Sequence, residues 1–172
     1  ISEYAKDKVE VEKMILEREN SISFRLATVF GMSPRMRLDL LVNDFTYRAV
    51  KDCFLIIYEG HFKRNFIHVR DVTQVFLHGI SNFDSMRGEI FNVGLSDSNL
   101  SKIELCQVIQ GILPDFFFHE AEVGKDPDQR NYVVSNAKIE ATGFKFVHSL
   151  KQGIGELIKG YAMIKQSKYR NF

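Results

Sequence analysis

The chain has 172 residues and a mass of 19.9 kDa, which is the length of a single domain. Its 45% hydrophobic and 26% charged residues are typical of a globular protein and exclude a disordered or fibrous one. The net charge is only +1 and both signs are interspersed, so we expect no nucleic-acid partner.

Membrane and metal partners are not expected either. No apolar stretch approaches the about 20 residues of a membrane span, and no signal peptide opens the charged N-terminal region. We therefore expect a cytoplasmic protein. Cys53 and Cys106 stand alone in apolar runs, without the spacing of a zinc site, which predicts two buried free thiols and no metal. The chain opens on Ile within a helical pattern, so we expect further sequence upstream.

The first predicted element is a helix over residues 2–19, with Ser2 as its N-cap. Three- and four-residue spacing defines one face of this helix, which carries Tyr4, Lys8, Val11 and Ile15. A separation of four residues places the tyrosine and the lysine about one turn apart on the same side. From these residues alone, an ordinary helix with a half-buried tyrosine and a solvated lysine is an alternative.

Strands and helices alternate through the rest of the chain. The predicted strands cover 21–30, 54–58, 66–69, 88–94 and 115–123, and the first of them reads as buried on both faces. The predicted helices cover 35–52, 70–81, 102–113, 135–144 and 148–166. Ser101 and Glu104 form a capping box before the third of these, and a polar loop over 59–65 precedes the third strand. This alternation predicts an α/β layered architecture.

Several segments follow one another in an order that points to one family. They are Tyr4-x-x-x-Lys8, RLATVFG (25–31), LLVNDF (40–45), KRNFIHVRDV (63–72), GEIFNVG (88–94) and DQRNYVVSNAKI (128–139). In order and spacing the series resembles the extended short-chain dehydrogenases/reductases, the NAD-dependent epimerase/dehydratase family that acts on nucleotide sugars. The YxxxK motif alone is a weak signal, so the resemblance depends on the whole series.

The resemblance implies an α/β fold that is the C-terminal half of a Rossmann-like protein. It contains the last parallel strands and a small mixed α/β substrate-binding part, but not the N-terminal GxxGxxG half, and no glycine-rich phosphate loop occurs in the sequence. Residues 1–58 are expected to end the Rossmann core, and residues 59–172 to be mainly substrate-binding. A homodimer through the YxxxK helix is also implied, with an apolar interface of Val9, Val11, Met14, Ile15 and Leu16.

Tyr4 and Lys8 are the catalytic residues that the resemblance implies. A free phenol is a poor base at neutral pH, since its pKa is near ~10. A neighbouring ammonium and the positive nicotinamide ring of NAD both favour the phenolate. Tyr4 is expected to take a proton from a sugar hydroxyl, while Lys8 holds the nicotinamide ribose. Ala27 and Val29 complete the expected cofactor contacts, with NAD as the cofactor and NADP as an alternative.

Five residues are candidates for the nucleotide-sugar substrate. The guanidinium of Arg64 offers a rigid fork of donors to the diphosphate, with an ordinary surface arginine as the alternative. Asn43 offers its amide to the same group, with an exposed helical asparagine as the alternative. Arg35 and Arg130 are further basic candidates near the substrate. Thr28 stands where the family commonly has asparagine, which leaves the identity of the sugar open.

The expected reaction is sugar 4-epimerisation through transient oxidation. A 4,6-dehydratase or a 4-keto-sugar reductase of the same family is an alternative, as is a non-catalytic fragment that binds a ligand or a partner. His68 and Asp71 resemble an acid–base pair, but the motif around them predicts structural roles.

Overall fold

The computed structural model describes residues 3–126 and 130–163. The helices are α1 (Glu3–Leu16), α2 (Leu41–Lys51), α3 (Val69–Ser81), α4 (Phe83–Met86), α5 (Lys102–Gln110), α6 (Ala137–Glu140) and α7 (Leu150–Met163). The strands are β1 (Ser23–Leu26), β2 (Thr28–Phe30), β3 (Phe54–Ile57), β4 (Lys63–His68), β5 (Ile90–Val93), β6 (Asn99–Ser101) and β7 (Phe117–Glu120). The predicted α/β architecture is confirmed. The N-cap prediction for Ser2 lies outside the described residues.

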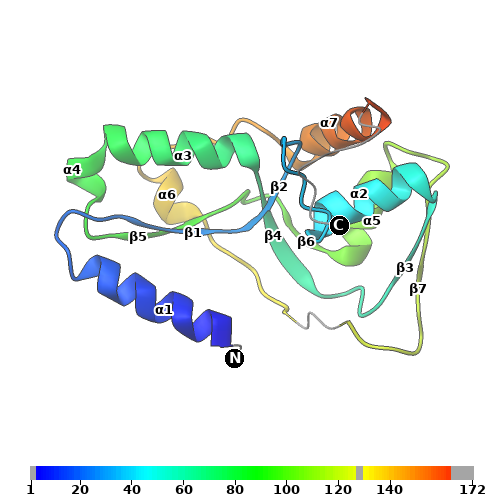
Figure 1. The fold of residues 1–172 in the computed structure, drawn as a ribbon, viewed down its shortest axis with the longest axis horizontal. Helices are drawn as coiled ribbons and strands as arrows, with labels where there is room; N and C mark the ends of the chain where they lie inside the picture. The colour runs from blue at the N-terminus through cyan, green and yellow to red at the C-terminus, as the bar shows by residue number, and fades with distance from the viewer. Residues whose placement is uncertain (1–2, 127–129, 164–172) are drawn as a thin grey trace.

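Within residues 3–126 and 130–163, three small sheets form the framework (Figure 1). At one end β1 and β5 run parallel, and α1 and α3 lie on opposite sides of this pair. In the middle β2 runs parallel to β4, and β4 runs antiparallel to β6. At the other end β3 and β7 run parallel beside α2 and α5, and α7 packs on α2. The chain therefore passes from the first sheet to the second at the junction of β1 and β2.

The predicted strand over 21–30 is two strands. Ala27 still donates its N–H to Val93 O at 2.8 Å, but the next residue, Thr28, is opposite Phe66 of β4. The chain thus changes partner at one residue. The prediction that this strand is buried on both faces is wrong for β1, where Arg25 and Leu26 are exposed. Within the described residues β1 pairs with β5 alone, so its second edge lacks a neighbouring strand.

Two further boundaries differ from the prediction. The helix predicted over 35–52 begins at Leu41, because residues 33–40 form turns in which the Arg37 side chain pairs with Asp39 at 2.7 Å. The loop predicted over 59–65 is wrong at its end, since Lys63 already belongs to β4. The antiparallel partner that extends β4 is β6, a three-residue strand that the sequence pattern did not predict.

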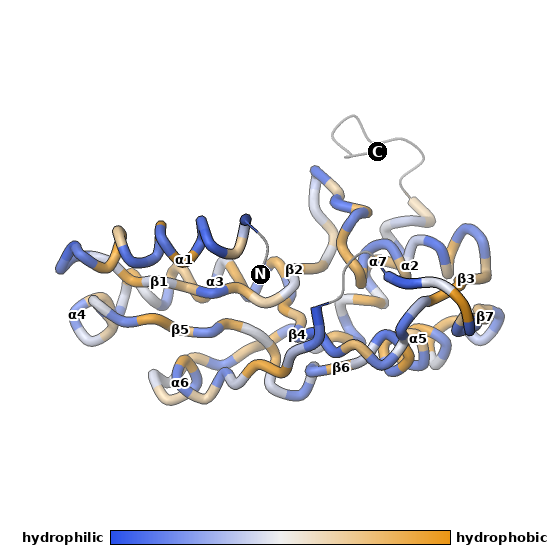
Figure 2. Tube along the Cα trace, turned by 90° about the horizontal axis from the view of Figure 1, so that it is seen from below, coloured by the Kyte–Doolittle hydropathy of each residue, from blue (hydrophilic) through white to orange (hydrophobic). Residues whose placement is uncertain are grey.

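In the part of the chain that the structure describes, the core consists of two groups of buried apolar side chains. One includes Phe30 and Phe66 together with side chains of α2, α5 and α7, and the other surrounds Ile67 between α3 and β5. Phe146 packs against both groups and so joins them. The α1 helix contributes no buried residue, and Figure 2 shows polar positions along much of its length. In the described part, no helix is both long and apolar enough to span a bilayer.

The two cysteines differ in environment. Cys106 is a buried free thiol, as predicted, and burial raises its pKa to about 12. The prediction that Cys53 is buried is wrong, because its side chain is exposed. Cys53 lies at the turn between α2 and β3 with a φ of 55°, a left-handed conformation that an L-residue adopts mainly in turns. This turn directs the thiol away from the core.

Candidate functional site

One face of α1 is attached to β1 through a carboxylate. Glu12 accepts a hydrogen bond from Ser23 Oγ at 2.8 Å and another from Arg25 Nε at 2.9 Å. The Arg25 guanidinium holds the pKa of Glu12 below its ordinary value. Glu12 follows Tyr4 and Lys8 at four-residue intervals, so the three side chains share the face that looks toward β1.

Tyr4 and Lys8 open onto a cavity of about 440 Å³ between α1 and β1. Lys8 Nζ lies 5.5 Å from the centroid of the Tyr4 ring, and Tyr4 is 68% exposed. The other lining residues are Val11, Glu12, Ile15, Ser23, Phe24, Arg25 and Leu26. The predicted pairing on one helical face is therefore present, and both polar groups are accessible to a ligand in this open cavity.

The apolar residues predicted for a dimer interface do not form one surface. Val11 and Ile15 line the cavity beside β1, whereas Val9 and Met14 do not and are 49% and 65% exposed. The homodimer through this helix stays a prediction.

The three residues after β1 lead from the α1 cavity into the middle sheet. Ala27, Thr28 and Val29 are each partly buried. The backbone of Gly94 approaches this segment closely. A Cβ added at Gly94 would stand 2.8 Å from the Ala27 Cβ and 1.7 Å from Asn65 Oδ1. Gly94 therefore lets β5 end directly against Ala27.

Arg64 lies inside β4 and is only 3% exposed, so the alternative of a surface arginine is wrong. Its Nη1 donates to Lys63 O at 3.0 Å, and its guanidinium lies 5.5 Å from the centroid of the Tyr132 ring. A buried guanidinium is stable only with acceptors around it. The Arg64 side chain is thus held in position against the segment that contains Tyr132.

Asn43 is also buried, so the alternative of an exposed helical asparagine is wrong. Its Oδ1 accepts from Gly31 N at 3.1 Å, and its Nδ2 donates to Arg37 O at 3.0 Å. The side chain therefore attaches the turn after β2 to the first turn of α2. An amide nitrogen carries two hydrogens, so Nδ2 has one further donor beyond this bond. Arg35 and Arg130, the other basic candidates, are both exposed.

A second cavity, of about 720 Å³, lies between α2 and β3. Its lining combines apolar and aromatic side chains with charged ones, namely Asp44, Phe45, Arg48, Asp52, Phe54, Leu55, Ile56, Tyr58 and Asp126. None of these residues belongs to the site predicted from the sequence. In the sequence, their alternation of apolar and polar residues is typical of an ordinary strand and helix. Asp126 lies beside them only in the folded chain.

His68 and Asp71 form hydrogen bonds that stabilise the fold. His68 caps α3 by accepting from Arg70 N at 3.3 Å. Asp71 accepts from His148 N at 3.0 Å and from His148 Nδ1 at 2.8 Å, so it braces the segment before α7. This geometry agrees with the structural roles predicted for both. Among the residues described, no three His, Cys, Asp or Glu side chains gather as a metal site would require.

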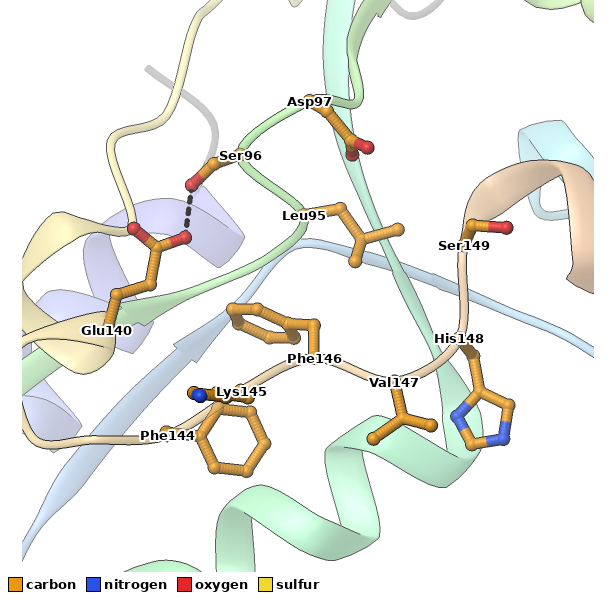
Figure 3. A pocket seen from close by; sticks show the side chains of 10 residues that line it. All are labelled: Leu95, Ser96, Asp97, Glu140, Phe144, Lys145, Phe146, Val147, His148 and Ser149. Atoms are coloured by element: carbon orange, nitrogen blue, oxygen red, sulfur yellow. Dashed lines mark hydrogen bonds between the residues drawn. The ribbon is translucent and has the colours of Figure 1, made fainter.

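A third cavity, of about 610 Å³, lies beside the segment between α6 and α7 (Figure 3). Phe144, Phe146 and Val147 contribute apolar side chains, and Ser96 Oγ donates to Glu140 Oε1 at 2.6 Å across one side. None of the predicted site residues lines this cavity. It is therefore separate from the candidate catalytic and substrate groups.

Known proteins resemble this chain in both sequence and fold. Residues 1–94, more than half of the 172, match the model of the NAD dependent epimerase/dehydratase family. The fold is similar to that of RMD from Pseudomonas aeruginosa complexed with NADPH, at 19% identity and a TM-score of 0.77. That match covers 93% of this chain and 56% of the other protein.

Two further structures extend the similarity. One is dTDP-glucose 4,6-dehydratase from Bacillus anthracis in complex with NAD, at 20% identity and a TM-score of 0.73, over 95% of this chain and 53% of the other. Another is UDP-glucose 4-epimerase with UDP-glucose from Thermotoga maritima, at 20% identity and a TM-score of 0.65, over 81% and 45%. The chain thus spans about half the length of these proteins.

Proposed function

Because the chain belongs to the NAD dependent epimerase/dehydratase family, we propose that it forms the part of a nucleotide-sugar epimerase or dehydratase that carries the Tyr–Lys pair and the substrate-binding residues. The observation that supports this best is the cavity between α1 and β1, onto which Tyr4 and Lys8 both open. Within the family the finer proposal is a sugar 4-epimerase. A dehydratase or a 4-keto-sugar reductase would use the same pair.

The residues present fit the nicotinamide end of NAD or NADP. A hydroxyl and an ammonium open onto one cavity of about 440 Å³, a volume within the range of small-molecule sites. Tyr4, Lys8, Ala27 and Val29 would hold this end of the cofactor. When bound, the cofactor supplies the acceptor for a hydride from the sugar. The printed sequence has no glycine-rich loop for the pyrophosphate, so these residues account for only part of a cofactor site.

The chain's own chemistry is a proton transfer. In the phenolate form, the Tyr4 oxygen accepts a proton from a sugar hydroxyl and becomes a neutral phenol. The Lys8 ammonium, one helical turn away, stabilises the phenolate charge before that transfer. The attachment of Glu12 to Ser23 and Arg25 holds the helix so that this face looks toward β1.

The substrate would extend from this face to α2. Arg64 and Asn43 are proposed for the diphosphate, with Thr28, Arg35 and Arg130 as further contacts. The cavity between α2 and β3 is proposed for the nucleotide end, because it joins aromatic and apolar side chains to polar ones that can form hydrogen bonds with a base, and its volume suits a nucleotide. A cytoplasmic homodimer remains part of the proposal, and sedimentation would test the dimer.

Catalysis is tested by Tyr4→Phe and Lys8→Met in the longest natural polypeptide that contains this chain. The assay follows conversion of a panel of nucleotide sugars with NAD or NADP. We expect each variant to lower kcat by about 10²–10⁴-fold, the range for loss of a positioned acid–base group. Lys6→Met is the matched control, since Lys6 lies on the same helix and pairs with Glu3. Full turnover by Tyr4→Phe would exclude a catalytic role for this hydroxyl.

A non-catalytic role predicts a different result. The wild-type protein would bind a nucleotide sugar but yield no product with either cofactor. The proposal assigns only part of a cofactor site to this chain. If the 172 residues alone bound NAD or NADP tightly, that assignment would be wrong.

A further inference from the structure

Lys102 is a buried cation at the start of α5. It is 2% exposed and follows the N-cap residue Ser101. Its ammonium donates to Tyr58 O at 2.7 Å, forms an ion pair with the Asp126 carboxylate, and lies 5.3 Å from the centroid of the Phe62 ring. An apolar side chain of similar volume often serves stability as well as a buried ion pair does. The charge therefore suggests a role beyond filling the core.

Both partners of Lys102 belong to one cavity wall. Tyr58 and Asp126 line the cavity between α2 and β3, whereas Lys102 does not line it. Tyr58 directly follows β3, and Asp126 lies in the segment after β7, so the two are far apart in the sequence. The Lys102 ammonium thus stands behind the wall and holds its two parts together.

The segment after β7 is fitted closely over Tyr58. Gly124 has a φ of +124°, and a Cβ added there would lie 2.5 Å from Tyr58 Cε1. The Asp126 N–H donates to Glu59 Oε2 at 2.9 Å, on the residue after Tyr58. One ammonium therefore fixes this segment through Asp126.

We infer that Lys102 is a positioning residue for the nucleotide end of the substrate. The inference rests on the proposed function, in which the α2–β3 cavity takes the nucleotide end of the substrate. Lys102 keeps the Tyr58 main chain and the Asp126 side chain in their bound arrangement before the ligand arrives. A preformed wall spares the ligand the cost of ordering it, so the effect appears in affinity. The Tyr4 and Lys8 chemistry is not affected by this role.

The experiment compares wild type with Lys102→Met and Asp126→Asn, using this chain. Calorimetric titration with UDP, dTDP, GDP, CDP and ADP measures affinity, and amide hydrogen exchange measures protection over residues 121–126. We expect on the order of tenfold weaker binding of the preferred nucleotide, with faster exchange in that segment. Lys138→Met is the matched control, because Lys138 forms a surface pair with Glu89, remote from this wall.

The results distinguish failure of the Lys102 positioning role from failure of the proposed nucleotide site. Unchanged affinity in folded Lys102→Met, with or without faster exchange, overturns the positioning role while the nucleotide site stands. Binding of none of the five nucleotides by wild type overturns the nucleotide site, and the inference with it. If Lys102→Met does not fold by circular dichroism, Asp126→Asn decides, because that side chain is 24% exposed and its amide oxygen can still accept a hydrogen bond from the Lys102 ammonium. In the longest natural polypeptide that contains this chain, a raised KM with unchanged kcat supports the role.

Discussion

His68 has charged groups around a buried imidazole. Its ring stacks on His148 at a centroid distance of 4.7 Å, and its Nε2 lies 3.5 Å from Glu156 Oε2, too far for a good hydrogen bond. Burial is the main cause that lowers the pKa of His68. His148 and Arg70 add to the lowering, and Glu156 and Asp71 oppose it. The folded protein therefore favours the neutral ring.

This preference predicts a loss of stability in mild acid. The unfolded chain takes up a proton at His68 below about pH 6.5, which the folded ring resists, so the free energy of unfolding falls as pH drops from about 6.5 toward 5. The contribution is at most about 1.4 kcal/mol per pH unit. Urea unfolding at several pH values measures it. His68→Asn keeps a capping oxygen for Arg70 N and should flatten the slope, whereas exposed His61→Asn should not. An equal slope in both variants would contradict the assignment.

At the level of elements, α7 shows that glycines in one helix have different roles. A Cβ at Gly153 would lie 2.4 Å from the Phe30 ring and 2.8 Å from the His68 ring. At Gly155 nothing lies within 4 Å of an added Cβ. The first glycine lets α7 approach β2 and β4 closely, and the second only lowers helix propensity. The sequence predicts the helix over 148–166, but only the packing shows which of its glycines is needed for a close approach.

Alanine substitutions at Gly153 and Gly155 should therefore change the free energy of unfolding in opposite directions. Gly153→Ala should lower the free energy of unfolding by about 1–3 kcal/mol through overpacking. Gly155→Ala should raise it by about 0.5–1 kcal/mol through helix propensity. Thermal melts of the two variants make a matched comparison, with expected shifts of about 2–4 °C per kcal/mol. Similar shifts of the same sign would contradict this packing.

Local patterns predicted the elements that depend on local chemistry. The capping box is present, with Glu104 N donating to Ser101 Oγ at 3.1 Å and Ser101 N donating to Glu104 Oε2 at 2.7 Å. Gly143 has a φ of +87° just past α6, as expected of a helix-ending glycine. β6 and the break at Ala27 were missed because both depend on hydrogen bonds to distant strands.

The same distinction holds for the candidate site. The face shared by Tyr4 and Lys8 follows from helical spacing alone and could be predicted. Lys102 could not, since its position after an N-cap reads as solvated, and only residues near 58 and 126 bury it. The exposure of Cys53 likewise depends on a left-handed turn that its apolar neighbours do not indicate.

At the scale of the whole molecule, α1 is the loosely attached part of a well-packed chain. It buries no residue, whereas Phe146 joins the two apolar groups elsewhere. Its attachment depends on Glu12, which is 13% exposed, paired with Arg25, which is 55% exposed. The proposed catalytic pair thus stands on α1, which alone among the described helices buries no residue, and its orientation depends on a carboxylate.

Glu12→Gln should loosen α1 without unfolding the rest. We expect amide exchange in α1 to accelerate on the order of tenfold, while the free energy of global unfolding changes by less than about 0.5 kcal/mol. Acid should act similarly on wild type. Because the pKa of Glu12 is lowered in the folded state, its contribution is present above about pH 4.5 and is lost as pH falls through the lowered value. Glu10→Gln, an exposed carboxylate on the same helix, is the control, and equal exchange in both variants would contradict the attachment.

The contrast between the two cysteines makes one position chemically addressable. Cys106 is buried and keeps its proton, so a maleimide dye reaches Cys53 alone without any cysteine being removed. That thiol stands between Asp52 and Phe54, which both line the α2–β3 cavity. A fluorophore on Cys53 would report directly whether a ligand occupies the α2–β3 cavity beside it.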